Sequence, residues 1–140
     1  QFVARGVHVV TNFRKDQATA EAFRAEFKGA EVDVFQADLG EEVGVQKLFD
    51  FVKEKHGHLN YYVANAAATA FKPLLDIKPH HLEKTFAITV TGFLIGCQRS
   101  AELMRGQKGK IVAISGYDTH TYLPRHGVLG AAKSALETLV

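Results

Sequence analysis

A lysine near the end of the chain is close in sequence to several groups that could donate a proton. Lys133 follows His126 by seven residues, and Tyr122 and Tyr117 lie in the same predicted loop. An imidazolium can protonate an enolate or carbonyl oxygen, because its unperturbed pKa is about 6.5. A nearby ammonium group opposes that charge and favours a neutral, hydrogen-bonding histidine. The pattern indicates proton transfer to a substrate oxygen, and a loop histidine without chemistry is the alternative.

The elements around these groups indicate how they are positioned. Residues 110–114 form a predicted apolar strand, Ser115 follows it directly, and Lys133 is expected to open the final helix. Earlier predicted strands are residues 7–11, 32–36 and 61–64. Between them, Asp16 can cap a helix that ends at Gly29, and a second helix stops at Gly57. This alternation predicts an α/β class with a doubly wound parallel sheet.

A long helix is predicted between the third and fourth strands. Pro79 suits its first turn, and apolar residues then recur at helical spacing for about six turns. The expected inward stripe comprises Leu82, Phe86, Val90, Phe93, Leu94, Cys97, Ala101 and Met104.

Composition excludes several classes of function. The 140 residues are 46% hydrophobic with a net charge of +2, so we expect a globular cytoplasmic protein that binds neither nucleic acid nor membrane. Its single cysteine, Cys97, excludes an internal disulfide. We expect no metal site, because His80 and His81 are adjacent and His56 and His58 have no carboxylate at ligand spacing.

Short motifs follow two of the predicted strands: Asp38-Leu39 after residues 32–36 and Asn65-Ala66-Ala67 after residues 61–64. In this order they resemble motifs of the short-chain dehydrogenases/reductases, and the resemblance covers essentially residues 1–140. In that family the first pair holds the adenine ring and the second turn packs on the cofactor. Asn12 and Arg14 lie where the adenosine ribose would be recognised. A cation there can bind a 2′-phosphate, so the resemblance implies NADPH as cofactor, with NADH as the alternative.

Within the family, the chain is most similar to NADPH-dependent enoyl-acyl-carrier-protein reductases that resemble 3-oxoacyl reductases. Residues 65–73, 114–115, 122–123 and 130–137 carry this likeness. In such a Rossmann-type fold, the strand at residues 7–11 would be the second strand. We therefore expect residues 1–140 to be a single NAD(P)-binding domain truncated at both ends, lacking its first strand and C-terminal part. Without that central strand, a groove and unpaired strand edges would remain open.

The chain departs from the family pattern at the proton-transfer positions. The usual serine falls on Gly116, the tyrosine of Tyr-x3-Lys on Leu129, and the asparagine of the long helix on Thr89. The enoyl-reductase spacing Tyr-x6-Lys instead falls on His126. The resemblance implies that Lys133 binds the nicotinamide ribose and assists the proton donor.

Two functions remain open. The first is an NAD(P)H-dependent reductase of an enoyl or 3-oxo acyl thioester, a small-molecule or acyl-carrier-bound substrate of fatty-acid or polyketide type. Lys133, His126, Tyr122 and Ser115 would be its catalytic residues. The second is a non-catalytic nucleotide-binding or scaffold protein that has lost the usual serine and tyrosine. We expect a homodimer or homotetramer through the long helix and the small residues Ala131, Ala132, Ala135 and Leu136.

Overall fold

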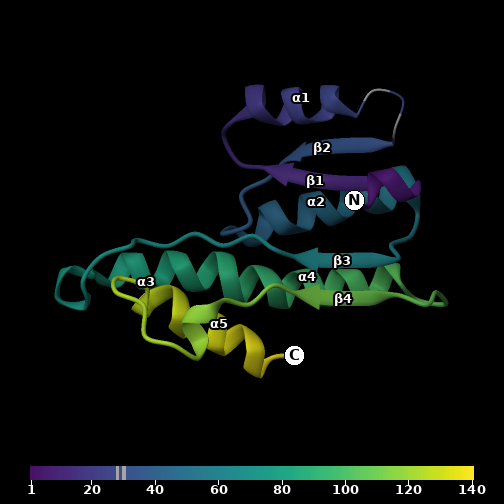
Figure 1. Cartoon of the computed structure of the whole chain (residues 1–140). Helices are drawn as coiled ribbons and strands as arrows, with labels where there is room; N and C mark the ends of the chain where they lie inside the picture. Colours follow the sequence, from purple (N-terminus) through teal and green to yellow (C-terminus); the bar gives the residue numbers. More distant parts are fainter. Residues whose placement is uncertain (28, 30) are drawn as a thin grey trace.

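The computed structural model describes residues 1–27, 29 and 31–140, and its strands and helices alternate as predicted (Figure 1). In these residues the strands are β1 (Val9–Phe13), β2 (Val32–Gln36), β3 (Tyr61–Ala64) and β4 (Lys110–Ala113). The α-helices are α1 (Gln17–Glu26), α2 (Glu42–His56), α3 (Pro79–Phe86), α4 (Gly92–Leu103) and α5 (Gly127–Thr138). Short 3₁₀ turns occur at Val3–Arg5, Leu74–Asp76 and Tyr117–Thr119. The first strand begins two residues later than predicted, whereas the second and third have the predicted bounds.

The strands form two parallel pairs separated by a groove. β1 pairs with β2, with Val9 opposite Val32, and β3 pairs with β4, with Tyr61 opposite Lys110. Among the described residues no strand pairing joins β1 to β3, and the two strands lie apart in Figure 1. A groove of about 830 Å³ is lined by residues of both strands. The parallel pairs and the open groove are those expected of this sheet.

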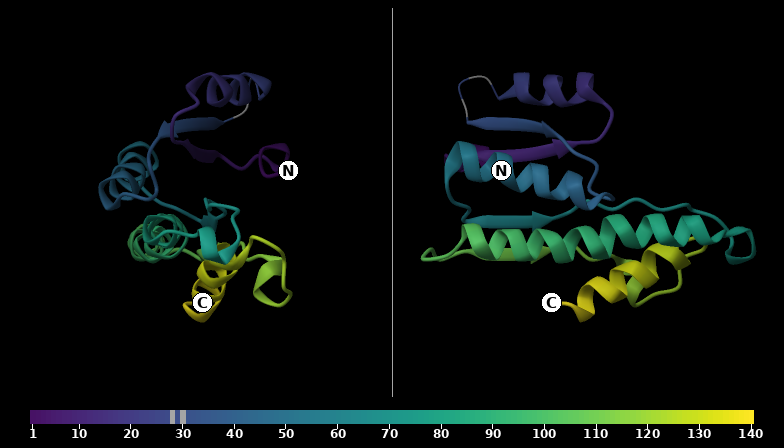
Figure 2. Two further views of the ribbon diagram at one scale, coloured as in Figure 1. Left: turned by 90° about the vertical axis from the view of Figure 1, so that its left-hand side faces the viewer. Right: turned by 180° about the vertical axis from the view of Figure 1, so that it is seen from behind.

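Helices cover the strands in an arrangement that follows from their apolar faces. α2 and α4 pack side by side on one face of the strands, and α1 lies against β2 (Figure 2). Asp16 caps α1 by accepting a hydrogen bond from the Thr19 amide at 2.9 Å, as predicted. Gly57 ends α2 with a φ of 75°, a conformation that favours glycine. In the described part of the chain no helix is long and apolar enough to cross a bilayer.

The long helix buries a face that is shifted from the predicted one, although Phe93 and Met104 of the predicted stripe are buried as expected. α3 and α4 are joined by a π-helical segment, Ala87–Thr91. The other buried residues of the long helix lie mostly one position before stripe residues and are mostly small: Thr85, Ile88, Thr89, Gly92, Gly96 and Ser100. Leu82 and Leu94 are exposed, which corrects the prediction that they face the core. Close backbone approach explains this choice, since a Cβ at Gly96 would lie 2.4 Å from the Tyr62 hydroxyl.

Candidate active site

Lys133 is a buried cation at the carboxyl end of β4. It is the seventh residue of α5, which begins at Gly127, so the prediction that it opens the helix is wrong. Lys133 is only 5% exposed, and its Nζ donates a hydrogen bond to the carbonyl oxygen of Ile114. Burial lowers the pKa of Lys133, and the negative charge of Asp118 opposes that shift. The lysine is therefore a desolvated group with a carboxylate nearby, in contrast to an ordinary surface lysine.

Asp118 is hydrogen-bonded to the candidate proton donor His126, and it lies close enough to Lys133 for its charge to act on the lysine. His126 lies directly before α5, and its Nδ1 is 3.2 Å from Oδ2 of Asp118. The Asp118 side chain is only 5% exposed. Because an ionised carboxylate can only accept, Nδ1 donates, and Nε2 remains available to a ligand. The ring of Phe71, from the loop after β3, lies 4.7 Å from the imidazole centroid.

Asp118 was not predicted from the sequence. Its carboxylate occupies the space next to Gly116, where the side chain of a serine at position 116 would lie. A Cβ added to Gly116 would lie 2.2 Å from Oδ1 of Asp118. The carboxylate and a side chain at position 116 therefore compete for the same space. A serine at position 116 is therefore incompatible with the observed position of the Asp118 carboxylate.

The remaining predicted proton-transfer residues lie apart from this pair. Ser115 Oγ donates to Oε1 of Glu137, which also accepts from Thr119 Oγ1 at 3.0 Å. The hydrogen bond from Ser115 lowers the pKa of Glu137 despite opposition from desolvation, and Thr119 and His120 contribute further. Tyr122 is 86% exposed and Tyr117 is also exposed. The structure thus pairs His126 with Asp118, whose negative charge acts on Lys133, whereas Ser115 is hydrogen-bonded to Glu137 and Tyr122 faces solvent.

The predicted cofactor residues near β1 and β2 lie at the carboxyl ends of these strands. Arg14 Nη1 is 3.7 Å from Oδ2 of Asp38, and both side chains are about 40% exposed. Asp38 also accepts from the Gly40 amide at 3.0 Å. Asn12 donates from Nδ2 to the carbonyl oxygen of Ala37 at 3.3 Å. A cation and a carboxylate therefore stand next to each other at this edge.

Two glycines hold the Asp38-Leu39 segment close to the helices. A Cβ at Gly44 of α2 would lie 2.1 Å from the Asp38 carbonyl oxygen, and one at Gly92 of α4 would lie 2.6 Å from that of Leu39. Larger side chains at either glycine would displace the segment. The position of Asp38 therefore depends on close packing as well as on its hydrogen bonds.

The groove between the strand pairs runs along the gap where a central strand is expected, and most of the predicted cofactor residues line it. The part that fits a ligand is the end beside the carboxyl ends of β1 and β3, because dinucleotides bind at that edge of such a sheet. Its lining includes Asn12, Arg14, Leu39, Asn65, Ala66 and Lys133, whereas Asp38 and Ala67 lie outside it. Thr89 also lines the groove, and its buried Oγ1 has no hydrogen-bond partner within the described residues. An unpaired buried hydroxyl, a buried ammonium and a guanidinium fit a ligand that carries hydroxyl and phosphate groups. The residues present are thus compatible with a nicotinamide dinucleotide.

Comparisons with known proteins agree with this geometry. A family model described as enoyl-(acyl carrier protein) reductase matches residues 1–140. A 1-cyclohexenylcarbonyl-CoA reductase from Streptomyces collinus is 38% identical over 138 residues, covering 97% of this chain and 49% of the relative. A versicolorin reductase from Emericella nidulans is 30% identical over 140 residues, covering 97% and 52%.

A similar solved structure is a short chain dehydrogenase from Burkholderia cenocepacia in complex with NADP. It aligns with a TM-score of 0.91 at 25% identity, covering 98% of this chain and 57% of that one. A short-chain dehydrogenase/reductase mutant from Serratia marcescens aligns with a TM-score of 0.89 at 22% identity, a likeness of fold alone. The chain spans about half the length of the curated relatives it matches.

Proposed function

The chain belongs to the short-chain dehydrogenase/reductase family, and on this premise we propose that the whole protein reduces an enoyl or 3-oxo acyl thioester with NADPH. The observation that carries the proposal is the buried Lys133, placed with Asp118 and His126 beside a groove lined by the predicted cofactor residues. The Streptomyces collinus relative is named a 1-cyclohexenylcarbonyl-CoA reductase, and this name supports an acyl thioester as substrate.

Each residue has a distinct part in the proposed reaction. Bound NADPH supplies a hydride to the substrate carbon. Lys133 keeps N–H donors beyond the one used by Ile114, and these can hold ribose hydroxyls. In this step His126 is protonated on both nitrogens: it donates a hydrogen bond or its Nε2 proton to the developing oxyanion and becomes neutral, while Asp118 orients the ring through Nδ1. Asp118 is a positioning residue because it acts through His126.

Arg14 supports the choice of NADPH over NADH. Its contact with Asp38 is long and solvent-exposed, so the guanidinium can turn to a 2′-phosphate at little cost. We expect Arg14→Ala to raise KM for NADPH at least about tenfold and to leave KM for NADH nearly unchanged. Arg24→Ala, which removes an exposed arginine of α1, is the matched control. Equal losses with both cofactors would contradict a 2′-phosphate contact.

Several positions favour the non-catalytic alternative. Gly116 and Leu129 stand where the family has its serine and tyrosine, and Ser115 is hydrogen-bonded to Glu137. A protein with these residues could keep nucleotide binding and lose turnover. A test of the function must therefore measure both NADPH binding and turnover.

The test is NADPH oxidation by the whole protein with crotonyl-CoA and acetoacetyl-CoA, in wild type and in His126→Phe and Lys133→Ala. We expect each variant to lose about 10²–10⁴-fold in kcat. His120→Phe is the control, because it removes an exposed histidine of the same loop. Turnover that survives in His126→Phe would move the donor to Tyr122 or Tyr117. Saturable NADPH binding without turnover on any substrate would support the non-catalytic protein.

We also propose that the whole protein is a homodimer or homotetramer. Two residues of the apolar stripe that the long helix leaves outside the core, Leu82 and Leu94, support this, since they are exposed at 44% and 46%. Ala132 and Leu136 of α5 are instead buried within this chain. Leu94→Glu should reduce the mass measured by light scattering, and an unchanged mass would exclude this face as the interface.

A further inference from the structure

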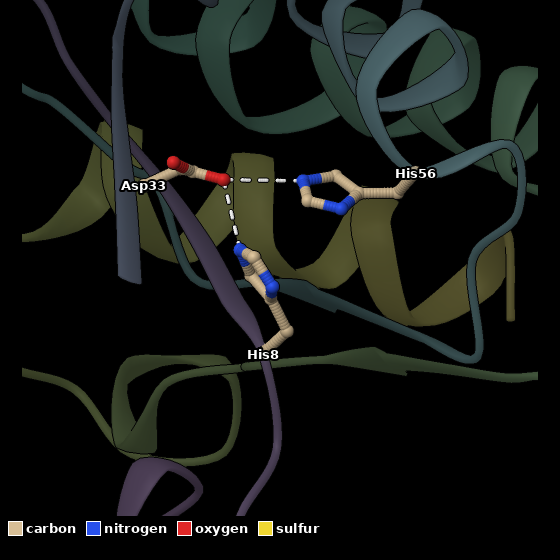
Figure 3. Close-up of side chains that lie close together, drawn as sticks. All are labelled: His8, Asp33 and His56. Atoms are coloured by element: carbon tan, nitrogen blue, oxygen red, sulfur yellow. Dashed lines mark hydrogen bonds and ion pairs between the residues drawn. The ribbon is translucent and has the colours of Figure 1, made fainter. Parts of the chain in front are cut away.

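Three side chains from distant parts of the sequence meet at the amino-terminal end of β1 and β2 (Figure 3). His8 lies just before β1, Asp33 is the second residue of β2, and His56 is the last residue of α2. Nε2 of His8 is 2.8 Å from Oδ2 of Asp33, and Nε2 of His56 is 3.1 Å from the same oxygen. The three atoms all lie within 4.8 Å of one another.

A second carboxylate orients the ring of His8. Its Nδ1 lies 3.1 Å from Oε2 of Glu31, and a carboxylate accepts, so Nδ1 carries a proton. Nε2 of His8 and Oδ2 of Asp33 then face each other across one hydrogen-bond position. A cation that displaces the proton there would bind both atoms. Carboxylates that hold the far nitrogen of a ligating histidine are a regular feature of metal sites.

We propose that His8, Asp33 and His56 bind a divalent transition-metal cation of the zinc class, with water as the fourth ligand. Two imidazole nitrogens and one carboxylate oxygen suit zinc, whereas calcium and magnesium prefer oxygen ligands alone. Bonds of about 2.0–2.2 Å in a tetrahedral site separate ligand atoms by roughly 3.3 Å. The 2.8 and 3.1 Å separations from Asp33 therefore need only small side-chain movements, and the two histidine nitrogens, which lie within 4.8 Å of each other, must also reach this separation.

Burial and charge support the ligand role of Asp33. It is 8% exposed, and its burial alone would raise its pKa. Hydrogen bonds from Lys55, His8 and His56 together with the charge of Lys55 outweigh burial and lower the pKa of Asp33 to about 2. Asp33 is thus an anion at neutral pH. The imidazoles of His8 and His56 are partly exposed, so a cation can enter from solvent.

Lys55 is the main competitor for the carboxylate. Its Nζ donates to Oδ1 of Asp33, which leaves Oδ2 for the two histidines. The Lys55 side chain is 46% exposed and can turn into solvent when a cation binds. Removing its charge should tighten metal binding, whereas removing a histidine should weaken it.

The site is separate from the proposed reductase chemistry. It lies at the opposite end of the strands from Arg14 and Asp38, and it connects α2 to β1 and β2. A cation bound there would cross-link these elements. Because the ligands come together only in the folded chain, binding would also raise the unfolding temperature.

The test is a titration of the chelator-treated whole protein with Zn²⁺ by calorimetry, together with the visible absorption of bound Co²⁺. We expect one site, weakened at least about tenfold in His8→Gln and in His56→Gln, with Glu31→Gln giving a smaller loss. Lys55→Met should tighten binding, a gain that misfolding cannot produce. His80→Gln, which removes an exposed histidine of α3, should bind as wild type does. Absence of binding in wild type, or affinity unchanged in both ligand variants, would overturn the proposal.

Discussion

Replacing Gly116 by alanine should force the Asp118 carboxylate away from His126. The added Cβ would lie 2.2 Å from Oδ1 of Asp118, whereas ordinary contact begins near 3.4 Å, so the carboxylate must move by about 1 Å. Its side chain is 5% exposed and hydrogen-bonded, which leaves little freedom to move. Overpacking of this kind costs about 1–3 kcal/mol, and the displaced hydrogen bond adds to the loss.

Thermal and urea unfolding of the whole protein would measure this cost. Gly127→Ala is the matched control, since nothing lies within 4 Å of its added Cβ. In an Asp118→Ala background the clash is removed, so Gly116→Ala should cost no more there than Gly127→Ala does. Equal stability of Gly116→Ala and Gly127→Ala in the wild-type background would refute the placement of Asp118. Additive costs in the double variant would refute it as well.

Other regions of the chain give further predictions. Leu136→Ala should lower the free energy of unfolding, measured in urea, by about 2–5 kcal/mol, because Leu136 is only 2% exposed. Leu139→Ala is the control: Leu139 is 51% exposed, so its loss should change the free energy of unfolding by less than about 0.5 kcal/mol. Hydrogen bonds from Thr19 lower the pKa of Asp16, so its stabilisation is complete above the unfolded pKa of about 4 and is lost as pH falls through the lowered value. Asp16→Asn should remove this acid dependence in unfolding experiments, and persistence of the same dependence would assign it to another group. Burial, and to a lesser extent Cys97, raises the pKa of Tyr62 to about 12, so an ultraviolet titration should lose its most alkaline phenol transition in Tyr62→Phe.

Local patterns were sufficient to predict most of the elements. The second and third strands have the predicted bounds, and α2 ends at the predicted Gly57. Alternating strands and helices with short connections specify parallel pairing with few alternatives. The family was likewise predictable, because its motifs are short, contiguous and ordered along the chain.

Errors arose where packing outweighs local preference. Lys133 was predicted to open the final helix, whereas α5 begins six residues earlier at Gly127, and glycine is a poor helix former that gives no local signal for a helix start. The buried side chains of Val128 and Leu136 stabilise α5 from Gly127 onward. Packing also decides which face of the long helix is buried, because close contact with Tyr62 requires a glycine at position 96.

Side chains that meet across the fold leave no periodic signal. Asp118 and His126 are eight residues apart in an irregular loop, and neither spacing nor hydrophobicity indicates their contact. His8, Asp33 and His56 are separated by more than twenty residues at each step, and only the parallel pairing of β1 with β2 and the return of α2 bring them together. Sequence spacing alone therefore does not indicate that these three residues meet.

The pairing of Gly116 with Asp118 bears on the choice between enzyme and scaffold. A carboxylate that is 5% exposed is costly to bury, and the cost is offset only by partners such as His126 and Lys133. A scaffold that had simply lost its serine would have no need for a buried charge in the vacated space. A reductase that replaced tyrosine by histidine would need one, because the imidazole must be oriented and its positive charge balanced. The arrangement therefore favours His126 as the proton donor of an enzyme. On this reasoning, Asp118→Asn should lower kcat with little change in KM for NADPH.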